Sequence, residues 1–543
     1  MAEKTVAHLL IQTLRNIGVQ HVFGIPSGGW VDYMEAIRQT DGIEFVLTSH
    51  EGGASFMAAV CGQLTGIPGV CFGTFGPGAT NLTTGVGCAL LDRSPMIAFT
   101  DEMPEDMRGR TTQMGIDHQA LFRPLTKQTT RLEPDRVQEI ILQAAETALS
   151  ELPGPVHVGL PVGMSAQLAS AVNSPELNPQ QPLTPSTESL SKAQELLHRS
   201  RKPILAIGLG AVRAGVQSKV LKLAEAGQLP IVLTPMAKGM VPESHPCYAG
   251  VLFHALSDQV GHIHHQSDLV VAIGYDPVEF NYESWLPEVP LISVDTVPTD
   301  LNRNQYNLAC EVIGDISIAI QKLSETITNN KEWDLQNLAS WREQLFQKMA
   351  SNSDNFGPCH ALEILRQVLP EEGIMVCDVG AHTHLIGQKW PTPQPGLQLM
   401  TNGWSSMGYG LPGAIAAKLC RPKLPVCAVL GDGGFLMSAG ELATAVRENL
   451  HIVFVVLTDS DLALIRIKQQ KKNNPIYGTP LQGPTTTGGN NIFGVPVHRA
   501  SDPVQLETEL QKAFQQKGPV IVEAMIDSRE YDSLVLKSDK PNS

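Results

Sequence analysis

The sequence predicts an α/β protein built from three doubly wound parallel-sheet domains. Short apolar runs, each closed by glycine, proline or a polar residue, alternate with longer segments of helical period along the chain. Strands that alternate with helices pair in parallel and carry helices on both faces of the sheet. A chain of 543 residues is also too long for one hydrophobic core, because single cores stop growing at about 250–300 residues.

We expect the first domain at residues 1–165, the second at 190–325 and the third at 358–530. The stretch 166–191 is rich in Ser, Pro and Gln and has no sustained period, so it is predicted to be a surface linker. Residues 325–357 are expected to form a helix followed by a second linker.

Composition and charge exclude several classes of protein. A formal charge of −15 argues against nucleic acid as a partner, since a phosphate backbone requires a basic face. No stretch of about 18 apolar residues is present, so we expect no membrane span. The nine cysteines form no CxxC pair and several lie in apolar runs. They are therefore expected to be reduced and structural, which favours the cytoplasm.

The segment VCAVLGDGGFLMSAGELATAVRENLHIVFVVLTDSD carries the strongest chemical signal. Its first strand ends in the glycine-rich turn 431–434, which lets the backbone approach a ligand, and the following helix offers free N–H groups to a phosphate. A second apolar strand, 452–457, is followed by Asp459. If the two strands are neighbours, Asp432 and Asp459 meet at one sheet edge and form an oxygen site suited to Mg²⁺. The alternative is an ordinary turn and an exposed acidic loop.

Two further strand-to-helix turns are candidates. In FVLTSHEGGAS, Glu51 lies where a strand gives way to a helix, and the glycines after it leave space beside the carboxylate. A first-turn glutamate that favours the helix dipole is the alternative interpretation. In GTFGPGATNL, residues 76–81 join another strand to a helix, and by itself this could be only a tight turn.

These three features in this order resemble the thiamine-diphosphate (ThDP)-dependent 2-oxo acid decarboxylase and acetohydroxyacid synthase superfamily. The resemblance covers essentially the whole chain and is closest to the FAD-independent, catabolic acetolactate synthases. Segments 120–127, 273–285 and 517–541 carry this closer likeness. It implies ThDP and Mg²⁺ as cofactors and makes FAD unexpected.

The resemblance also implies roles for individual residues. Glu51 matches the glutamate that hydrogen-bonds the aminopyrimidine ring and helps to deprotonate the thiazolium. Asp432 and Asp459 match the Mg²⁺ ligands, with the main-chain carbonyl of Asp461 as a third. Met407 matches the residue that props the cofactor in its bent shape. The other cofactor contacts implied are Pro26, Asn81, Gly380, Ala381, His382, Ser405, Gly433, Gly434 and Leu462. His50 is expected either to contact the substrate or only to cap the helix.

Several departures from the synthases leave the substrate open. Gly52 stands where they usually carry Gln, and Phe75 replaces a commonly small residue. We therefore expect an acetolactate-synthase-like carboligase that uses a 2-oxo acid, with pyruvate favoured. A simple 2-oxo acid decarboxylase or an acyloin lyase or ligase with another substrate is the alternative, and a non-catalytic homologue is a third.

A 2-oxo acid requires a cation near its carboxylate. Lys127, Arg466 and Lys468 are candidates, although each could equally lie on a basic solvated helix face. Leu464 and Ile465 are expected to wall the substrate pocket. Because the family completes each active site across a subunit interface, we expect a homodimer or homotetramer.

Overall fold

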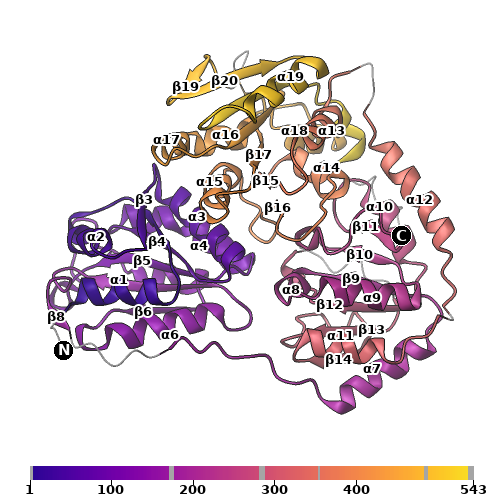
Figure 1. The fold of residues 1–543 in the computed structure, drawn as a ribbon, viewed down its shortest axis with the longest axis horizontal. Helices are drawn as coiled ribbons and strands as arrows, with labels where there is room; N and C mark the ends of the chain where they lie inside the picture. The colour runs from indigo at the N-terminus through magenta and orange to yellow at the C-terminus, as the bar shows by residue number, and fades with distance from the viewer. Residues whose placement is uncertain are drawn as a thin grey trace.

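A computed structural model of the chain describes residues 4–169, 176–279, 288–329, 331–351, 355–481 and 487–535. Three parallel sheets, each covered by helices, form three separate lobes that meet at the centre of the molecule (Figure 1). The predicted fold class is confirmed.

The first sheet has six parallel strands in the order β3-β2-β4-β5-β7-β6. One face is covered by α1, α2 and α6, and the other by α3 and α4. The elements of this lobe are α1 (Val6–Asn16), β2 (His21–Gly24), α2 (Val31–Arg38), β3 (Glu44–Leu47), α3 (Glu51–Thr65), β4 (Gly69–Gly73), α4 (Pro77–Leu91), β5 (Met96–Glu102), α5 (His118–Phe122), β6 (Gln128–Arg131), α6 (Val137–Leu149) and β7 (Pro155–Pro161).

The third lobe repeats this plan. Its sheet runs β16-β15-β17-β18-β21-β20-β19, and its six parallel strands follow the same order as the first sheet when each is numbered along the chain. Among the described strands of this sheet, β19 alone is antiparallel. The elements are α13 (Pro358–Val368), β15 (Ile374–Cys377), α14 (Ala381–Lys389), β16 (Gln398–Leu399), α15 (Gly410–Cys420), β17 (Val426–Gly431), α16 (Asp432–Ser438), α17 (Leu442–Arg447), β18 (Val453–Thr458), α18 (Ala463–Lys471), β19 (Asn491–Ile492), β20 (Val495–Ala500), α19 (Pro503–Ala513), β21 (Val520–Met525) and α20 (Glu530–Leu534).

The central sheet has a different order, β11-β10-β9-β12-β13-β14. This is the arrangement of dinucleotide-binding sheets, whose ligands bind where the order reverses, here between β9 and β12. The elements are α7 (Thr187–Arg199), β9 (Pro203–Ile207), α8 (Leu209–Arg213), α9 (Gln217–Gly227), β10 (Ile231–Leu233), β11 (Tyr248–Val251), α10 (Ser257–His264), β12 (Leu269–Ile273), β13 (Leu291–Asp295), β14 (Leu308–Ile313), α11 (Ile316–Ser324) and α12 (Leu335–Lys348).

The predicted linker 166–191 is wrong at both ends. Its first residues form β8 (Leu168–Ala169), which pairs antiparallel with β1 (Lys4–Thr5), so backbone hydrogen bonds tie it to the first lobe. Its last residues begin α7, where the Ser186 hydroxyl caps the helix by accepting from Ser189 N. Residues 170–175 lie outside the described chain, as do 280–285 of the segment 273–285 and 536–541 of the segment 517–541.

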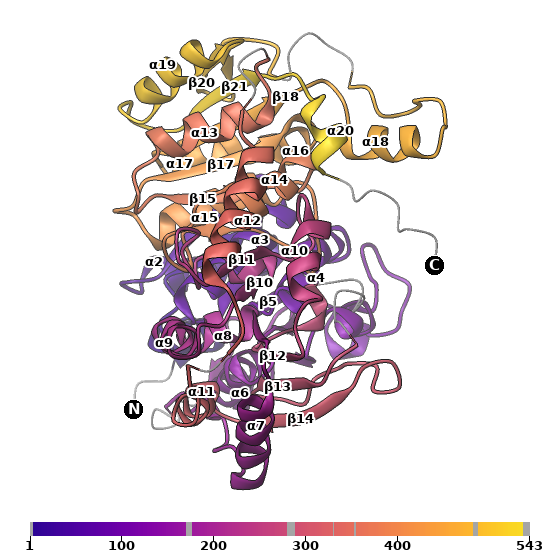
Figure 2. The ribbon, with the colours of Figure 1, turned by 90° about the vertical axis from the view of Figure 1, so that its right-hand side faces the viewer.

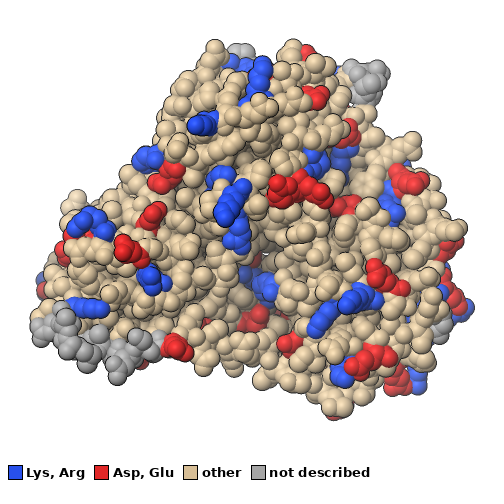
Figure 3. All heavy atoms as spheres, in the orientation of Figure 1, with Lys and Arg blue, Asp and Glu red and all other residues tan. Residues whose placement is uncertain are grey.

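Helices α3 and α15 join the first and third lobes (Figures 1 and 2). The rings of Phe56 and Tyr409 meet edge to face with centroids 5.8 Å apart, and both side chains belong to one continuous apolar core. No helix in the described ranges is both long and apolar enough to cross a membrane. On the face shown in Figure 3, positive and negative side chains are interspersed over all three lobes.

Candidate active site

Asp432 and the Asp459 loop meet at the carboxyl edge of the third sheet. Strands β17 and β18 are hydrogen-bonded neighbours with Gly431 opposite Leu457. Asp432 and Asp459, which directly follow these strands, therefore emerge side by side. The Asp432 side chain accepts hydrogen bonds from the N–H groups of Ser460 at 2.7 Å and Asp459 at 3.3 Å. The predicted juxtaposition is therefore confirmed.

Two carboxylate oxygens at this edge are buried and unpaired among the described residues. Asp459 Oδ2 and Asp461 Oδ1 are shielded from solvent and have no hydrogen-bond partner within the described part of the chain. Burial and the neighbouring Asp432 raise the pKa of Asp459 to about 7. Since a buried carboxylate oxygen is costly unless it is paired, these atoms fit a hard cation. The other oxygen of Asp461 is paired with Arg466 at 3.0 Å.

A pocket opens beside these carboxylates, and it is lined by residues of the third lobe alone. Gly433 lies between Met407 and Leu462 in its wall. A Cβ atom on Gly433 would approach the Leu462 side chain to 2.7 Å and that of Met407 to 3.0 Å, so only glycine leaves this space open. The predicted residues that line the pocket are Gly380, Ala381, His382, Met407, Asp432, Gly433, Gly434, Asp459, Asp461, Leu462, Leu464 and Ile465.

Asp378 organises this pocket, although the sequence analysis missed it. It is fully buried after β15, and its carboxylate accepts from Val379 N at 2.8 Å and from Gly408 N at 3.2 Å. A Cβ on Gly434 would lie 2.0 Å from Asp378 Oδ2. One carboxylate thus ties together the loops that carry His382, Met407 and the glycine-rich turn. An acidic residue directly after a buried strand was the available signal.

The loop after β15 brings a neutral imidazole to the pocket. His382 is buried, burial lowers its pKa to about 4, and its Nε2 has no partner among the described residues. Tyr531 of α20 also lines this pocket, together with Asp459 and Asp461. Nothing in the local sequence around Tyr531 predicts this, because α20 reaches the site only through the tertiary fold.

Glu51 begins α3, and its carboxylate is held by the second candidate turn. Asn81 of α4 donates from Nδ2 to Glu51 Oε2 at 3.0 Å, and Glu51 is 7% exposed. His50 is the N-cap residue of α3, since its Nδ1 accepts from Gly52 N at 2.9 Å. Of the two roles considered for His50, the structure supports the capping role.

A glutamate of the third lobe holds the start of α3 in place. Glu441 is buried, and its carboxylate accepts from His50 N at 2.9 Å and from Ser49 N at 3.1 Å. A Cβ on Gly53 would lie 2.3 Å from Glu441 Oε1, which explains the second glycine after Glu51. Glu441 was not predicted from the sequence, because its partners Ser49 and His50 are 392 and 391 residues away along the chain.

The remaining predicted residues do not line this pocket. They include Glu51, Asn81, Pro26, Phe75 and Ser405. Within one chain the structure therefore shows two half-sites, one in the first lobe and one in the third.

The three candidate cations differ in their surroundings. The Lys127 ammonium donates to Ser150 O at 2.6 Å and to Ser150 Oγ at 2.8 Å, and burial lowers its pKa to about 8. Arg466 pairs with Asp461 and with Asp532. Lys468 is exposed on α18, one turn beyond the pocket wall. Lys127 and Arg466 are thus engaged by groups of the protein, whereas the Lys468 side chain is exposed.

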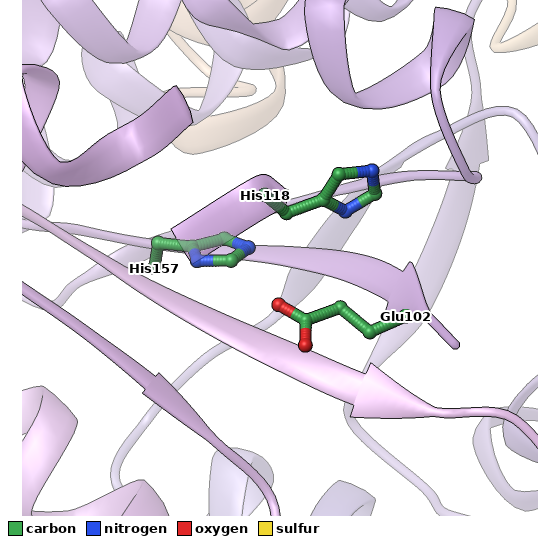
Figure 4. Close-up of side chains that lie close together, drawn as sticks. All are labelled: Glu102, His118 and His157. Atoms are coloured by element: carbon green, nitrogen blue, oxygen red, sulfur yellow. The ribbon is translucent and has the colours of Figure 1, made fainter. Parts of the chain in front are cut away.

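A buried polar cluster supports the turn that carries Asn81. His118 and His157 approach Glu102 in the core of the first lobe (Figure 4). His118 Nε2 accepts from Gly76 N at 3.2 Å, so its Nδ1 carries the proton and donates to the Thr100 hydroxyl, which donates to His157 Nε2. Burial lowers the pKa of His118 to about 4 and that of His157 to about 3. Both rings are therefore neutral, and the chain of bonds supports the GPGATN turn.

The central crevice differs from a nucleotide site. At the point where its strand order reverses, the Glu279 carboxylate accepts from Leu209 N, at the start of α8, and from Met236 N, each at 3.1 Å. Free N–H groups at such a helix start are what bind a dinucleotide phosphate. Here the Glu279 carboxylate of the protein itself accepts the hydrogen bond of the Leu209 N–H group.

Two half-sites of this kind, one with a helix-borne glutamate and one with a glycine-rich turn and metal carboxylates, define a thiamine-diphosphate enzyme. Family models agree along the chain. Residues 4–121 match the thiamine pyrophosphate enzyme N-terminal TPP binding domain, residues 190–323 its central domain, and residues 378–524 its C-terminal TPP binding domain.

Full-length relatives are similar over nearly the whole chain. An acetolactate synthase of Bacillus subtilis is 30% identical over 549 residues, covering 98% of this chain and 95% of the relative. A probable acetolactate synthase large subunit of Methanocaldococcus jannaschii is 28% identical, covering 96% and 92%. A chloroplastic acetolactate synthase of Arabidopsis thaliana is 27% identical, covering 97% and 82%. The chain belongs to the thiamine pyrophosphate enzyme family and is similar to its acetolactate synthases.

The third-lobe pocket fits the cofactor of this family. The unpartnered oxygens of Asp459 and Asp461 suit Mg²⁺, the start of α16 suits a diphosphate, and the gap that Gly433 leaves beside Met407 suits an apolar ring.

Proposed function

We propose that this enzyme decarboxylates a small 2-oxo acid, with pyruvate as the first candidate, and joins the remaining hydroxyalkyl unit to a second carbonyl compound. The arrangement that carries the proposal is the pairing of Asp432 and Asp459 beside the Gly433 gap, together with a separate buried Glu51. The acetolactate synthases among the relatives support pyruvate as donor.

When bound, thiamine diphosphate supplies the nucleophilic carbon and the electron sink for loss of CO₂. The protein's own residues bind, orient and exclude water. Asp432, Asp459 and the Asp461 carbonyl would hold Mg²⁺ and through it the diphosphate. Glu51, held by Asn81, would exchange a proton with the aminopyrimidine ring. Leu464 and Ile465 would limit the size of the substrate side chain.

We propose that the two half-sites are completed across the subunit interface of a homodimer or a homotetramer. The pocket of the third lobe lacks Glu51 in its own chain, and Leu436 and Met437 on α16 next to it are 53% and 65% exposed. Such apolar exposure beside an incomplete site supports coverage by a second copy.

We further propose that the three domains span residues 1–165, 190–325 and 358–530. We also propose a reducing, cytoplasmic location, which the nine free cysteines support. FAD remains unexpected, and the Glu279 carboxylate at the central crevice supports this prediction.

The test is product analysis with purified enzyme, ThDP, Mg²⁺ and a panel of 2-oxo acids. Acetolactate from pyruvate supports the proposal. Acetaldehyde alone would favour a simple decarboxylase, and an acyloin from another pair of substrates would favour an acyloin ligase. No CO₂ release from any member of the panel would favour a non-catalytic homologue.

A further inference from the structure

Two cysteines from different lobes meet at the contact between α3 and α15. The Sγ atoms of Cys61 and Cys420 are 2.7 Å apart although the residues are separated by 359 positions. All nine cysteines lie in described parts of the chain, and this is the only sulfur–sulfur contact among them.

The pair is accessible from outside. Cys61 and Cys420 line a surface cavity together with Arg421. Cys420 is partly exposed, whereas Cys61 is 7% exposed. The Arg421 guanidinium is fixed at this cavity, since its Nη2 donates to Leu64 O at 2.6 Å. A small oxidant in the cavity reaches Cys420 first.

We propose that Cys61 and Cys420 form an oxidisable dithiol, which a hydroperoxide converts into a disulfide between the first and third lobes. The sulfur atoms need to approach by less than about 1 Å to reach the bond length of about 2.05 Å. The two helices already pack against each other, which brings both thiols to one contact.

The chemistry takes two balanced steps. The Cys420 thiolate attacks the terminal oxygen of the hydroperoxide, the O–O bond breaks, and Cys420 sulfenic acid and an alcohol or water form after protonation. The Cys61 sulfur then attacks the Cys420 sulfur, the S–O bond breaks, and the Cys61 proton leaves with hydroxide as water. Two thiols lose two electrons in total, and the hydroperoxide gains them.

The order of the two cysteines follows from their surroundings. The neighbouring Cys420 and burial raise the pKa of the Cys61 thiol well above its ordinary value. Cys61 is thus a poor first nucleophile toward an oxidant in solution, and the partly exposed Cys420 takes this role. Cys61 is then in place as the resolving thiol before a second oxidant molecule arrives.

The disulfide would connect the two half-sites of one chain. Cys61 lies on the same helix as Glu51, roughly 15 Å further along its axis at 1.5 Å per residue. The bond would therefore not touch the reacting groups. It would hold α3 against the lobe that carries the glycine-rich turn, and thermal unfolding should occur at a higher temperature in the oxidised enzyme.

The test uses the full-length enzyme treated with hydrogen peroxide and then denatured for thiol titration. We expect nine free thiols before treatment and two fewer afterwards, full recovery with dithiothreitol, and a peptide pair linked through Cys61 and Cys420 in mass spectra. The closed loop should also increase mobility on a non-reducing gel. An unchanged thiol count, or sulfinic acid at Cys420 without the linked peptides, would overturn the proposal.

Variants sharpen the result. Cys420→Ser and Cys61→Ala should abolish the linked peptides and the mobility shift. Cys71→Ala is the matched control, because Cys71 is buried in β4 and its sulfur contacts Met96 and no other cysteine among the described contacts, so this variant should retain both. If Cys61→Ala does not fold, the partly exposed Cys420→Ser variant and the wild-type peptide map still decide the matter. A mobility shift that persists in Cys420→Ser would contradict the assignment.

Discussion

Asn81 donates a hydrogen bond from its side-chain nitrogen to Oε2 of Glu51 at 3.0 Å, and the two residues lie near the N-terminal ends of different helices. This bond joins two of the three motifs found in the sequence. Asn81 is the last residue of the GPGATN turn. The first residue of this turn, Gly76, donates a hydrogen bond from its N–H to His118 Nε2. The carboxylate is therefore oriented by two successive layers of polar contacts.

Replacing Glu51 by Gln should lower turnover at least about 100-fold, the usual contribution of a positioned proton-transfer group. The side chain keeps its shape and can still bond to Asn81, so circular dichroism and the melting temperature should change little. Glu44→Gln on the exposed end of β3 is the matched control. Turnover equal to that of this control would reject the role of Glu51.

Glu441 should act as a positioning residue for Glu51. In Glu441→Ala the N–H groups of Ser49 and His50 lose their acceptor, and each such hydrogen bond contributes about 0.5–1.5 kcal/mol. We expect a lower melting temperature, a fall in kcat and an altered pH profile of kcat, with Mg²⁺–cofactor affinity retained. Glu441→Gln keeps one acceptor oxygen and should restore part of kcat. A loss of stability with an unchanged pH profile would indicate a purely structural role.

The two aspartates of the metal site should respond differently to amide substitution. Asp432→Asn places an NH₂ group or a neutral oxygen against the N–H groups of Ser460 and Asp459, so calorimetry should show weak Mg²⁺ and ThDP binding. Asp459→Asn retains a carbonyl ligand and removes a like charge beside Asp432, so binding should survive. The exposed Asp41→Asn is the control. Equal losses in both site variants would contradict this division.

Adding one methyl group at Gly433 should close the ring-binding gap. The new Cβ would lie within 3.0 Å of Met407 and closer still to Leu462, so ThDP affinity should fall at least about tenfold, which corresponds to about 1.4 kcal/mol. Gly261→Ala is a suitable control, because no atom lies within 4 Å of its Cβ and it sits inside α10. Unchanged affinity in Gly433→Ala would show that the cofactor does not use this gap.

Stability should depend on pH through Glu279. Burial raises its pKa from 4.5 to about 7, so between these values the folded chain holds a proton that the unfolded chain has lost. Stability from this group therefore falls as pH rises from about 4.5 to about 7 and is level above that. The melting temperature of wild type relative to Glu279→Gln should decrease over this interval. A constant or increasing difference would mean that Glu279 is ionised throughout.

Much of the third-lobe site could be predicted from sequence because its groups follow buried strands directly. Asp432 and Asp459 needed only the assumption that two apolar strands are neighbours, and this was right. Glu441 and Tyr531 could not be found in this way, since each reaches its partners through packing between distant segments. The linker assignment failed at β8 because a two-residue strand has no recognisable period. The Cys61–Cys420 contact likewise depends on how two lobes dock.

The equal strand order of the first and third sheets has a further consequence. Helices α3 and α15 each follow the second strand of their sheet, and Cys61 and Cys420 are each the eleventh residue of their helix. In an isologous dimer, equivalent positions of equivalent helices touch where the two-fold axis passes through the interface. The first and third lobes of this chain are related in the same way as the two subunits of such a dimer. A substitution at the contact between α3 and α15 should therefore affect the packing of both helices, as a substitution on the two-fold axis of a homodimer affects both subunits.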